Sequence, residues 1–232
     1  MRVKINFLIN DNFTFRNSLN EAMTAFIYRC IGIADKRYSL MLHDNGFASA
    51  GYKKYVYHVY AFLQNNRIVK DQLLKGKATL IFSSALEDTI IKFVEGLIKI
   101  GKVQLYGHSF NILCIEYEPE PKLNDSVLFK ALSPVYMMDI NHNWLKPGNI
   151  EEKLITNLIE KYYALYKRLP RSLEMNIKFL NYSAEYLKYK QGTYKGYVGI
   201  VALQGDKELI KMAYESGLGS HNGIGLGLLE AI

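Results

Sequence analysis

The chain is poor in the residues that build disulfide-bonded, metal-binding or membrane-spanning proteins. It has only two cysteines, Cys30 and Cys114, and no Cys-x-x-Cys pair, so neither a disulfide framework nor a structural zinc site is expected. An unbroken run of about 18 apolar residues, as a transmembrane helix needs, is missing. The apolar segment at the N-terminus is short and alternates like a strand, unlike a signal peptide. We therefore expect a soluble, cytoplasmic protein that makes no membrane contact.

Several motifs of enzyme chemistry are missing as well. The sequence has no P-loop and no Gly-x-Ser-x-Gly element, and no pair of acidic residues has the spacing of metal ligands. We expect neither a cofactor nor a metal ion. What remains is an ordinary globular composition over 232 residues, with 49% hydrophobic and 22% charged residues. This length fits one large domain or two small ones.

The positive charge of the chain is unevenly distributed. The 29 Lys and Arg residues exceed the 22 Asp and Glu residues, which gives a net charge of +7. Residues 161–196 carry eight basic and only two acidic residues, together with 7 of the 18 tyrosines. Cations among flat aromatic rings suit a phosphate backbone and unstacked bases. A solvated basic face above buried tyrosines is the alternative. The candidate RNA contacts in this segment are Arg168, Arg171, Lys188 and Lys190.

The spacing of apolar residues in the first half predicts the order strand, helix, strand, strand, helix, strand. Residues 2–9 alternate as in a strand. Two capping boxes, Ser18-x-x-Glu21 and Ser84-x-x-Glu87, predict the starts of two helices, and Gly101 ends the second. A loop is expected after the first helix. The other strands are expected over 54–63, 78–83, 103–105 and 110–116. This order is the ferredoxin-like βαββαβ arrangement.

The same order recurs after the sequence Glu118-Pro119-Glu120-Pro121. Helices are expected over 150–166 and from Asp206 to Gly217, and strands over 126–138, 173–180, 194–203 and 223–232. We predict an α+β fold of two tandem ferredoxin-like (RRM-like) domains, residues 1–120 and 121–232. One larger α+β domain is the alternative.

The most specific motif is a pair of Gly-aliphatic-Gly triplets separated by five residues near the C-terminus. Glycines permit positive φ angles and let the backbone approach a ligand closely. A dinucleotide-binding fingerprint would lie between a first strand and its helix, whereas these glycines follow a helix and precede the last strand. The loop therefore fits an RNA backbone better, with a glycine-rich connector as the alternative. The candidate RNA contacts of this glycine loop are Gly217, Gly219, Ser220, His221, Gly225 and Gly227.

In this position the glycine loop resembles that of the RAMP superfamily of CRISPR-associated proteins. The rest of the chain resembles one branch of it, the endoribonucleases that cut CRISPR precursor RNA within the repeat. The matching segments extend over nearly the whole chain: Phe26-Ile27-Tyr28, Leu42-His43, Phe82-Ser83-Ser84, Val94-Glu95-Gly96-Leu97, Glu118-Pro119 and Leu132-Ser133-Pro134. The resemblance implies metal-independent attack of a ribose 2′-OH on the adjacent phosphate, which leaves a 2′,3′-cyclic phosphate and a 5′-OH. It implies CRISPR repeat RNA as the partner and leaves a homodimer and CRISPR effector subunits open.

That chemistry needs a base for the 2′-OH proton, an acid for the 5′ oxygen and a cation for the developing charge. Histidine titrates near neutrality, so His43 is the candidate base, although it can also serve as the acid. Tyr28 would supply or accept the other proton. Lys53 would stabilise the transition state, and Lys54, on the opposite strand face, is its rival and an RNA candidate. A turn histidine, a core tyrosine and edge-strand lysines are the ordinary alternatives. His58 is expected to be packed inside a strand.

Two other functions stay open from the sequence. A non-catalytic relative would hold repeat RNA only as a subunit of a larger complex. A two-domain ferredoxin-like protein would bind a small molecule or another protein. The loop histidine His43 favours the enzyme over both.

Overall fold

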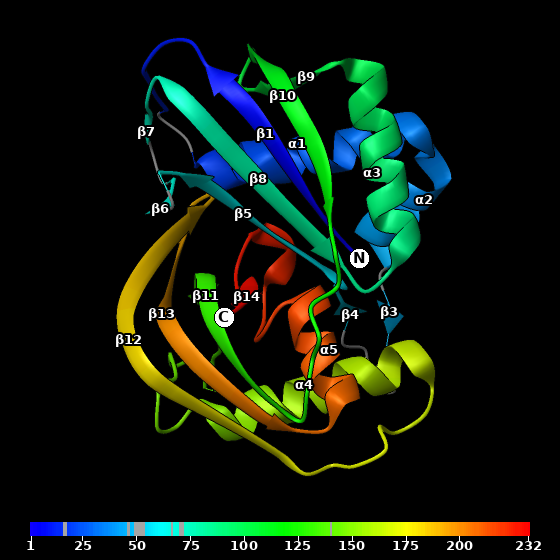
Figure 1. Cartoon of the computed structure of the whole chain (residues 1–232), viewed down its shortest axis with the longest axis vertical. Helices are drawn as coiled ribbons and strands as arrows, with labels where there is room; N and C mark the ends of the chain where they lie inside the picture. The colour runs from blue at the N-terminus through cyan, green and yellow to red at the C-terminus, as the bar shows by residue number, and fades with distance from the viewer. Residues whose placement is uncertain (16–17, 46, 49–53, 66, 70–71, 140) are drawn as a thin grey trace.

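In the computed structural model of the chain, two antiparallel sheets with their helices follow one another along the sequence (Figure 1). The structure describes residues 1–15, 18–45, 47–48, 54–65, 67–69, 72–139 and 141–232. Within these ranges, no helix has the length and apolar character needed to cross a membrane.

The first sheet has the strand order β6-β5-β8-β1-β10-β9, with every neighbouring pair antiparallel. Its strands are β1 (Arg2–Ile9), β5 (His58–Gln64), β6 (Arg67–Ile68), β8 (Gly76–Ser84), β9 (Lys102–Leu105) and β10 (His108–Glu118). Two short ribbons pair β2 (Phe13–Thr14) with β7 (Gln72–Leu73) and β3 (Phe47–Ala48) with β4 (Lys54–Tyr55).

Helices α1 (Leu19–Ala34) and α3 (Glu87–Ile100) cover one face of the first sheet. Successive side chains of a strand point to opposite faces, so every second residue of β1 is buried under these helices. The two helices approach closely at Gly96. A Cβ atom at this position would lie 1.8 Å from the carbonyl oxygen of Cys30, so only glycine permits this packing.

The second sheet has the order β12-β13-β11-β14. Its strands and helices are β11 (Ser126–Val135), α4 (Glu151–Tyr166), β12 (Met175–Tyr189), β13 (Gly192–Gly205), α5 (Lys207–Ser216) and β14 (Leu229–Ala231). In both sheets the first and third strands of a βαββαβ unit lie in the centre, so the tandem ferredoxin-like fold is confirmed. The division at residue 120 stays a prediction, since Tyr55 and Tyr57 are buried in the core of the second half.

The structure corrects the role of both predicted capping boxes. Helix α1 begins after Ser18, but the Ser18 hydroxyl makes no capping bond and donates to the backbone oxygen of Lys188. Helix α3 begins only at Glu87, because Ser84 is the last residue of β8. Its hydroxyl donates to the carbonyl oxygen of Tyr57. The predicted cap at Asp206 is confirmed, since its carboxylate accepts hydrogen bonds from two backbone N–H groups of α5.

Three other predictions of local structure were wrong. The strand expected over 54–63 is interrupted between β4 and β5. The loop expected after α1 contains helix α2 (Lys36–Leu40) and a π-helical turn, η1 (Met41–Asn45). The terminal segment 223–232 contributes part of a 3₁₀ turn, η2 (Asn222–Ile224), and only the short strand β14. The local periodicity of apolar residues does not reveal these breaks and turns.

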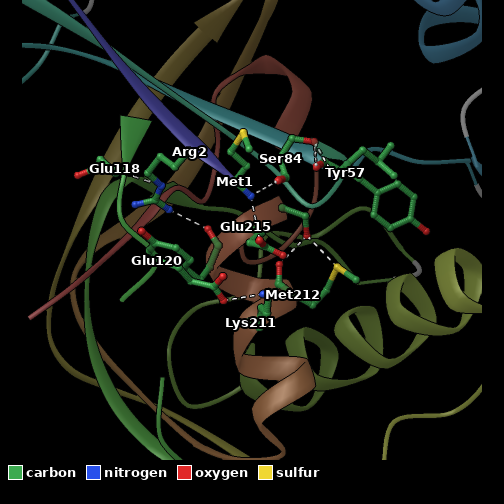
Figure 2. A network of polar contacts seen from close by, with 12 residues as sticks. Met1, Arg2, Tyr57, Ser84, Glu118, Glu120, Lys211, Met212 and Glu215 are labelled. Atoms are coloured by element: carbon green, nitrogen blue, oxygen red, sulfur yellow. Dashed lines mark hydrogen bonds and ion pairs between the residues drawn. The ribbon is translucent and has the colours of Figure 1, made fainter. Parts of the chain in front are cut away.

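A buried polar network around Arg2 joins the two halves (Figure 2). Arg2 is 3% exposed, donates to the carbonyl oxygen of Tyr214 at 2.8 Å, and has its guanidinium 3.8 Å from the centre of the Tyr214 ring. Beside it, the amino group of Met1 forms an ion pair with Glu215 at 2.9 Å. These contacts hold β1 against α5, the helix that leads into the glycine loop. An apolar cluster completes the junction: Val59, Ala61, Ile81, Leu132 and Leu228.

Candidate active site and RNA interface

Helix α1 presents a polar stripe, Asn20, Thr24 and Tyr28, toward the glycine loop. Residues four apart lie above one another on a helix, so the three side chains share one face. The Asn20 amide donates to the carbonyl oxygen of Ile224 at 2.8 Å. The Thr24 hydroxyl lies 3.5 Å from the carbonyl oxygen of Gly223. The start of α1 is therefore fixed to the loop, with Tyr28 one turn beyond the last of these contacts.

The two side chains predicted for proton transfer, Tyr28 and His43, lie next to one another. His43 is exposed on the η1 turn, and its ring centre lies 5.6 Å from that of Tyr28 in an edge-to-face arrangement. The hydroxyl of Ser39 donates to the backbone oxygen of Tyr28 at 3.2 Å and so ties α2 to α1 just before this turn. Burial raises the pKa of Tyr28 to about 12, so its hydroxyl keeps its proton at neutral pH.

A second histidine, His58, also contacts Tyr28. Its ring centre also lies 5.6 Å from that of Tyr28. His58 is 2% exposed, as the sequence predicted for a packed strand residue, and burial lowers its pKa to about 4. The ring is therefore neutral at physiological pH, and its buried Nε2 atom has no hydrogen-bond partner among the described residues. Tyr28 thus contacts two imidazoles, one exposed and one buried and uncharged.

The structure does not decide between the two candidate lysines. Lys53 lies outside the described residues. Lys54 is the first residue of β4, where its backbone pairs with Ala48, and its side chain is not among those described. The assignment of the stabilising cation stays a prediction.

The glycine loop folds back on the protein at four of its glycines. All four are buried and have positive φ angles between +83° and +92°: Gly217, Gly219, Gly225 and Gly227. A Cβ atom would lie 2.5 Å from the Tyr136 oxygen at Gly219 and 2.0 Å from the Leu218 oxygen at Gly227. These glycines therefore shape the loop, and their direct contact with RNA stays a prediction.

The outer part of the loop carries its polar side chains. Ser220 donates its backbone N–H to the carbonyl oxygen of Tyr136 at 2.9 Å. His221 is exposed, and its ring packs against Tyr136 and Tyr194 with both centres 5.2 Å away. Next to it opens a hollow of about 680 Å³, lined among others by Ser220, His221 and Lys153. Ser220 and His221 are thus the predicted loop contacts that a ligand can reach.

Lys161 is buried and holds the glycine loop through hydrogen bonds, although it belongs to the basic segment that was expected to face solvent or RNA. It is 2% exposed, and its ammonium donates to the Gly217 carbonyl oxygen at 3.0 Å and the Asn222 side-chain oxygen at 2.6 Å. The amide of Asn222 donates in turn to the carbonyl oxygen of Leu226 at 2.8 Å. Two side chains thus bridge both glycine triplets. Burial lowers the pKa of Lys161 to about 7.

The buried Lys161 predicts a stability that rises with pH between about pH 7 and about pH 9.5, because an unfolded lysine titrates near about 10.4. In this window the unfolded chain holds a proton that the folded chain has lost, so the free energy of unfolding increases with pH. Urea unfolding at both ends of the window should show a smaller increase for Lys161→Met than for the wild type. An equal increase in both proteins would contradict the assignment.

The structure separates the predicted basic contacts into two groups. Lys188 and Lys190 are exposed at the end of the β12–β13 hairpin, where the Lys188 backbone meets Ser18 at the start of α1. Arg168 instead pairs with Glu208 at 2.6 Å near the beginning of α5, and the Arg171 backbone binds the same carboxylate. The pairing with Arg168 lowers the pKa of Glu208 to about 2. Since the glycine loop follows the other end of α5, the two arginines do not join the site around Tyr28.

The sequence and the fold of the chain both match known proteins. Residues 117–231 match the family model of the CRISPR associated protein Cas6, C-terminal. Over 246 aligned residues the chain is 29% identical to the CRISPR-associated endoribonuclease Cas6 1 of Methanocaldococcus jannaschii, an alignment that covers 99% of this chain and 92% of the relative. The chain therefore resembles the Cas6 proteins, with the family model matching residues 117–231 and the curated relative aligning over nearly its whole length.

Two solved structures agree with this resemblance at the level of the fold. The product of a Cas6-related gene from Pyrococcus furiosus matches with a TM-score of 0.85 at 20% identity, over 100% of this chain and 98% of the other. A structure described as a RAMP protein binding different RNA substrates matches with a TM-score of 0.83, also at 20% identity, over 100% and 99%. These two structures show the fold, and the resemblance to CRISPR-associated endoribonucleases is confirmed by the family model and the curated relative.

Sequence reasoning missed several residues of this site. Asn20 and Thr24 lie four residues apart and lead to Tyr28, a polar spacing that could have been noticed beside the apolar stripe of α1. Lys161 and Asn222 gave no such signal, because their partners are distant in the sequence. Among the described residues, no cluster of three or more His, Cys, Asp or Glu side chains could hold a metal ion.

Proposed function

We propose that the chain is an endoribonuclease that cleaves CRISPR precursor RNA within the repeat, by attack of a ribose 2′-OH on the adjacent phosphate without a metal ion. The observation that carries the proposal is the contact of Tyr28 with the exposed His43, 5.6 Å between ring centres, beside the glycine loop. The name of the Methanocaldococcus jannaschii relative, a CRISPR-associated endoribonuclease, supports the same activity.

In the proposed reaction His43 takes the proton of the 2′-OH, the O2′–P bond forms and the P–O5′ bond breaks. Tyr28 gives its proton to the departing 5′ oxygen. The raised pKa of Tyr28 supports this assignment, because a hydroxyl with a pKa of about 12 holds a proton at neutral pH that it can donate. The products are a 2′,3′-cyclic phosphate and a 5′-OH. The proton held by His43 then returns to Tyr28 through solvent, which restores both side chains.

The proposal divides the remaining residues into those that bind RNA and those that shape the site. The contacts for the RNA backbone are the half-buried Ser220 and exposed His221 on the loop, and the exposed Lys188 and Lys190 on the hairpin. Lys53 or Lys54 would stabilise the charge that develops on the phosphorane. The buried glycines and Lys161 hold the loop in place.

The test is cleavage of a labelled CRISPR repeat RNA from the source genome, in the presence of EDTA. One cut within the repeat, with a 2′,3′-cyclic phosphate on one product and a 5′-OH on the other, is expected. Cleavage that appears only when Mg²⁺ is restored would contradict metal independence. Tight binding without cleavage under either condition would contradict the endoribonuclease activity. The chain would then be a subunit that only holds repeat RNA, with CRISPR effector subunits as its partners.

A further inference from the structure

Two exposed aromatic rings flank one lysine on the second sheet, away from the site around Tyr28. The ammonium of Lys195 lies 5.9 Å from the ring centre of Trp144 and 5.9 Å from that of Tyr186. Trp144 is 49% and Tyr186 48% exposed. We call Trp144, Tyr186 and Lys195 the aromatic platform.

The strand register explains why these side chains lie on one face. Tyr186 of β12 is directly opposite Lys195 of β13, so both side chains project to the same side of the hairpin. Tyr182 lies four residues earlier on β12, on the same face, and is also 48% exposed. The exposed aromatic surface therefore continues along the strand.

Trp144 is held by an ordered turn. The carboxylate of Asp139 accepts hydrogen bonds from the backbone N–H groups of Asn141 and Asn143, each at 2.8 Å, and these bonds lower the pKa of Asp139. The Leu145 N–H donates to the Met137 oxygen at 3.1 Å, directly after the tryptophan. A large apolar ring is thus displayed to solvent from a backbone fixed on both sides.

We propose that the aromatic platform binds unpaired bases of an RNA strand, which stack on Trp144 and Tyr186 while Lys195 contacts the phosphate between them. Aromatic faces accept any base, and interleaved cations neutralise the backbone, so such surfaces suit single-stranded RNA. The proposal extends the proposed function by naming a second RNA-binding surface and rests on it for the identity of the ligand.

Charge and position favour RNA over an apolar protein partner. Tyr186 and Lys195 belong to the segment 161–196, which carries eight basic and only two acidic residues, although one of the eight, Lys161, is buried. The exposed Lys188 follows Tyr186 on β12 and the exposed Lys190 lies in the turn after this strand, near the contact of Lys188 with Ser18 at the start of α1. RNA that leaves the site around Tyr28 can therefore follow cations and aromatic rings along the hairpin.

Trp144 is the only tryptophan of the chain, so tryptophan fluorescence reports on the platform alone. The probe is an unstructured RNA of about 12 nucleotides, a length within the range that single-strand-binding surfaces occupy. We expect saturable quenching of Trp144 emission in the full chain. Tyr186→Leu should weaken binding about tenfold, in line with the loss of one stacked base. Lys195→Gln should reduce the slope of log affinity against log salt by about one.

Tyr117→Leu is the matched control, because Tyr117 is 52% exposed but lies on β10 of the first sheet. The affinity of this variant for the RNA probe should stay at the wild-type value. RNA binding with unchanged Trp144 emission, and with equal affinity in Tyr186→Leu, would overturn the proposal. So would a failure of the wild type to bind the probe. Cleavage of the repeat is measured on the same preparations. Loss of cleavage with intact quenching would reject the proposed function and leave the platform standing.

Discussion

The His43→Ala variant is expected to cleave the repeat at least about a hundredfold more slowly than the wild type, since a positioned acid–base group contributes roughly 10²–10⁴-fold. Its affinity for the repeat should change little. The imidazole is exposed and contacts Tyr28 at the edge of its ring, so its removal opens no cavity in the core. Single-turnover cleavage and filter binding on the same RNA separate the two effects.

His108→Ala is the control for this variant. His108 is also exposed, but lies on β10 against Phe13, with ring centres 4.4 Å apart. The His108→Ala variant should cleave at the wild-type rate. Tyr28→Phe keeps the ring beside the two imidazoles and removes only the hydroxyl, so it should slow cleavage without loss of folding. Wild-type cleavage by His43→Ala would reject His43 as the base.

The second large effect concerns the stability of the glycine loop. Gly227 and Gly107 share the same φ of +83°, but a Cβ at Gly227 would lie 2.0 Å from the Leu218 oxygen, whereas Gly107 has no neighbour within 4 Å. Gly107→Ala should therefore cost only the left-handed backbone penalty, about 1–2 kcal/mol. Gly227→Ala adds a collision that the buried loop must absorb, about 1–3 kcal/mol more.

Urea unfolding of the two alanine variants measures this difference directly. Because whole domains are stable by only about 5–15 kcal/mol, Gly227→Ala should be visibly less stable and should lose RNA affinity with the loop. Gly219→Val and Gly225→Val are expected to behave in the same way, since both φ angles are positive and both positions are filled. Equal stability of Gly227→Ala and Gly107→Ala would show that the loop is not tightly packed.

The fold could be predicted because each half repeats one local pattern. Alternation in β1 and the apolar stripes of α1 and α3 report burial on one face, and the order of the elements then selects the ferredoxin-like topology. The last strand was predicted over 223–232, but its short extent as β14 and the turn η2 could not be predicted, because contacts with residues distant in the sequence shape the glycine loop before it. Periodicity carries no information on such contacts.

Part of the candidate site was predictable for a different reason. Tyr28 and His43 were predicted from a family resemblance, and the structure places their rings in contact. His58 was recognised as packed, but not as a neighbour of Tyr28. Lys161 was misplaced because a lysine within a basic segment is ordinarily solvated, and only the fold shows that Gly217 and Asn222 satisfy it.

The central claim is that the 2′-OH of the RNA itself attacks the scissile phosphate beside His43 and Tyr28. The most direct measurement uses repeat RNA with a single 2′-deoxy substitution at the nucleotide whose 2′-OH would attack, once the cut has been mapped. The account predicts unchanged binding and no cut at that position, while a 2′-deoxy nucleotide one position away leaves cleavage intact. Cleavage of the substituted RNA at the original phosphate would mean that another nucleophile attacks and would contradict the mechanism.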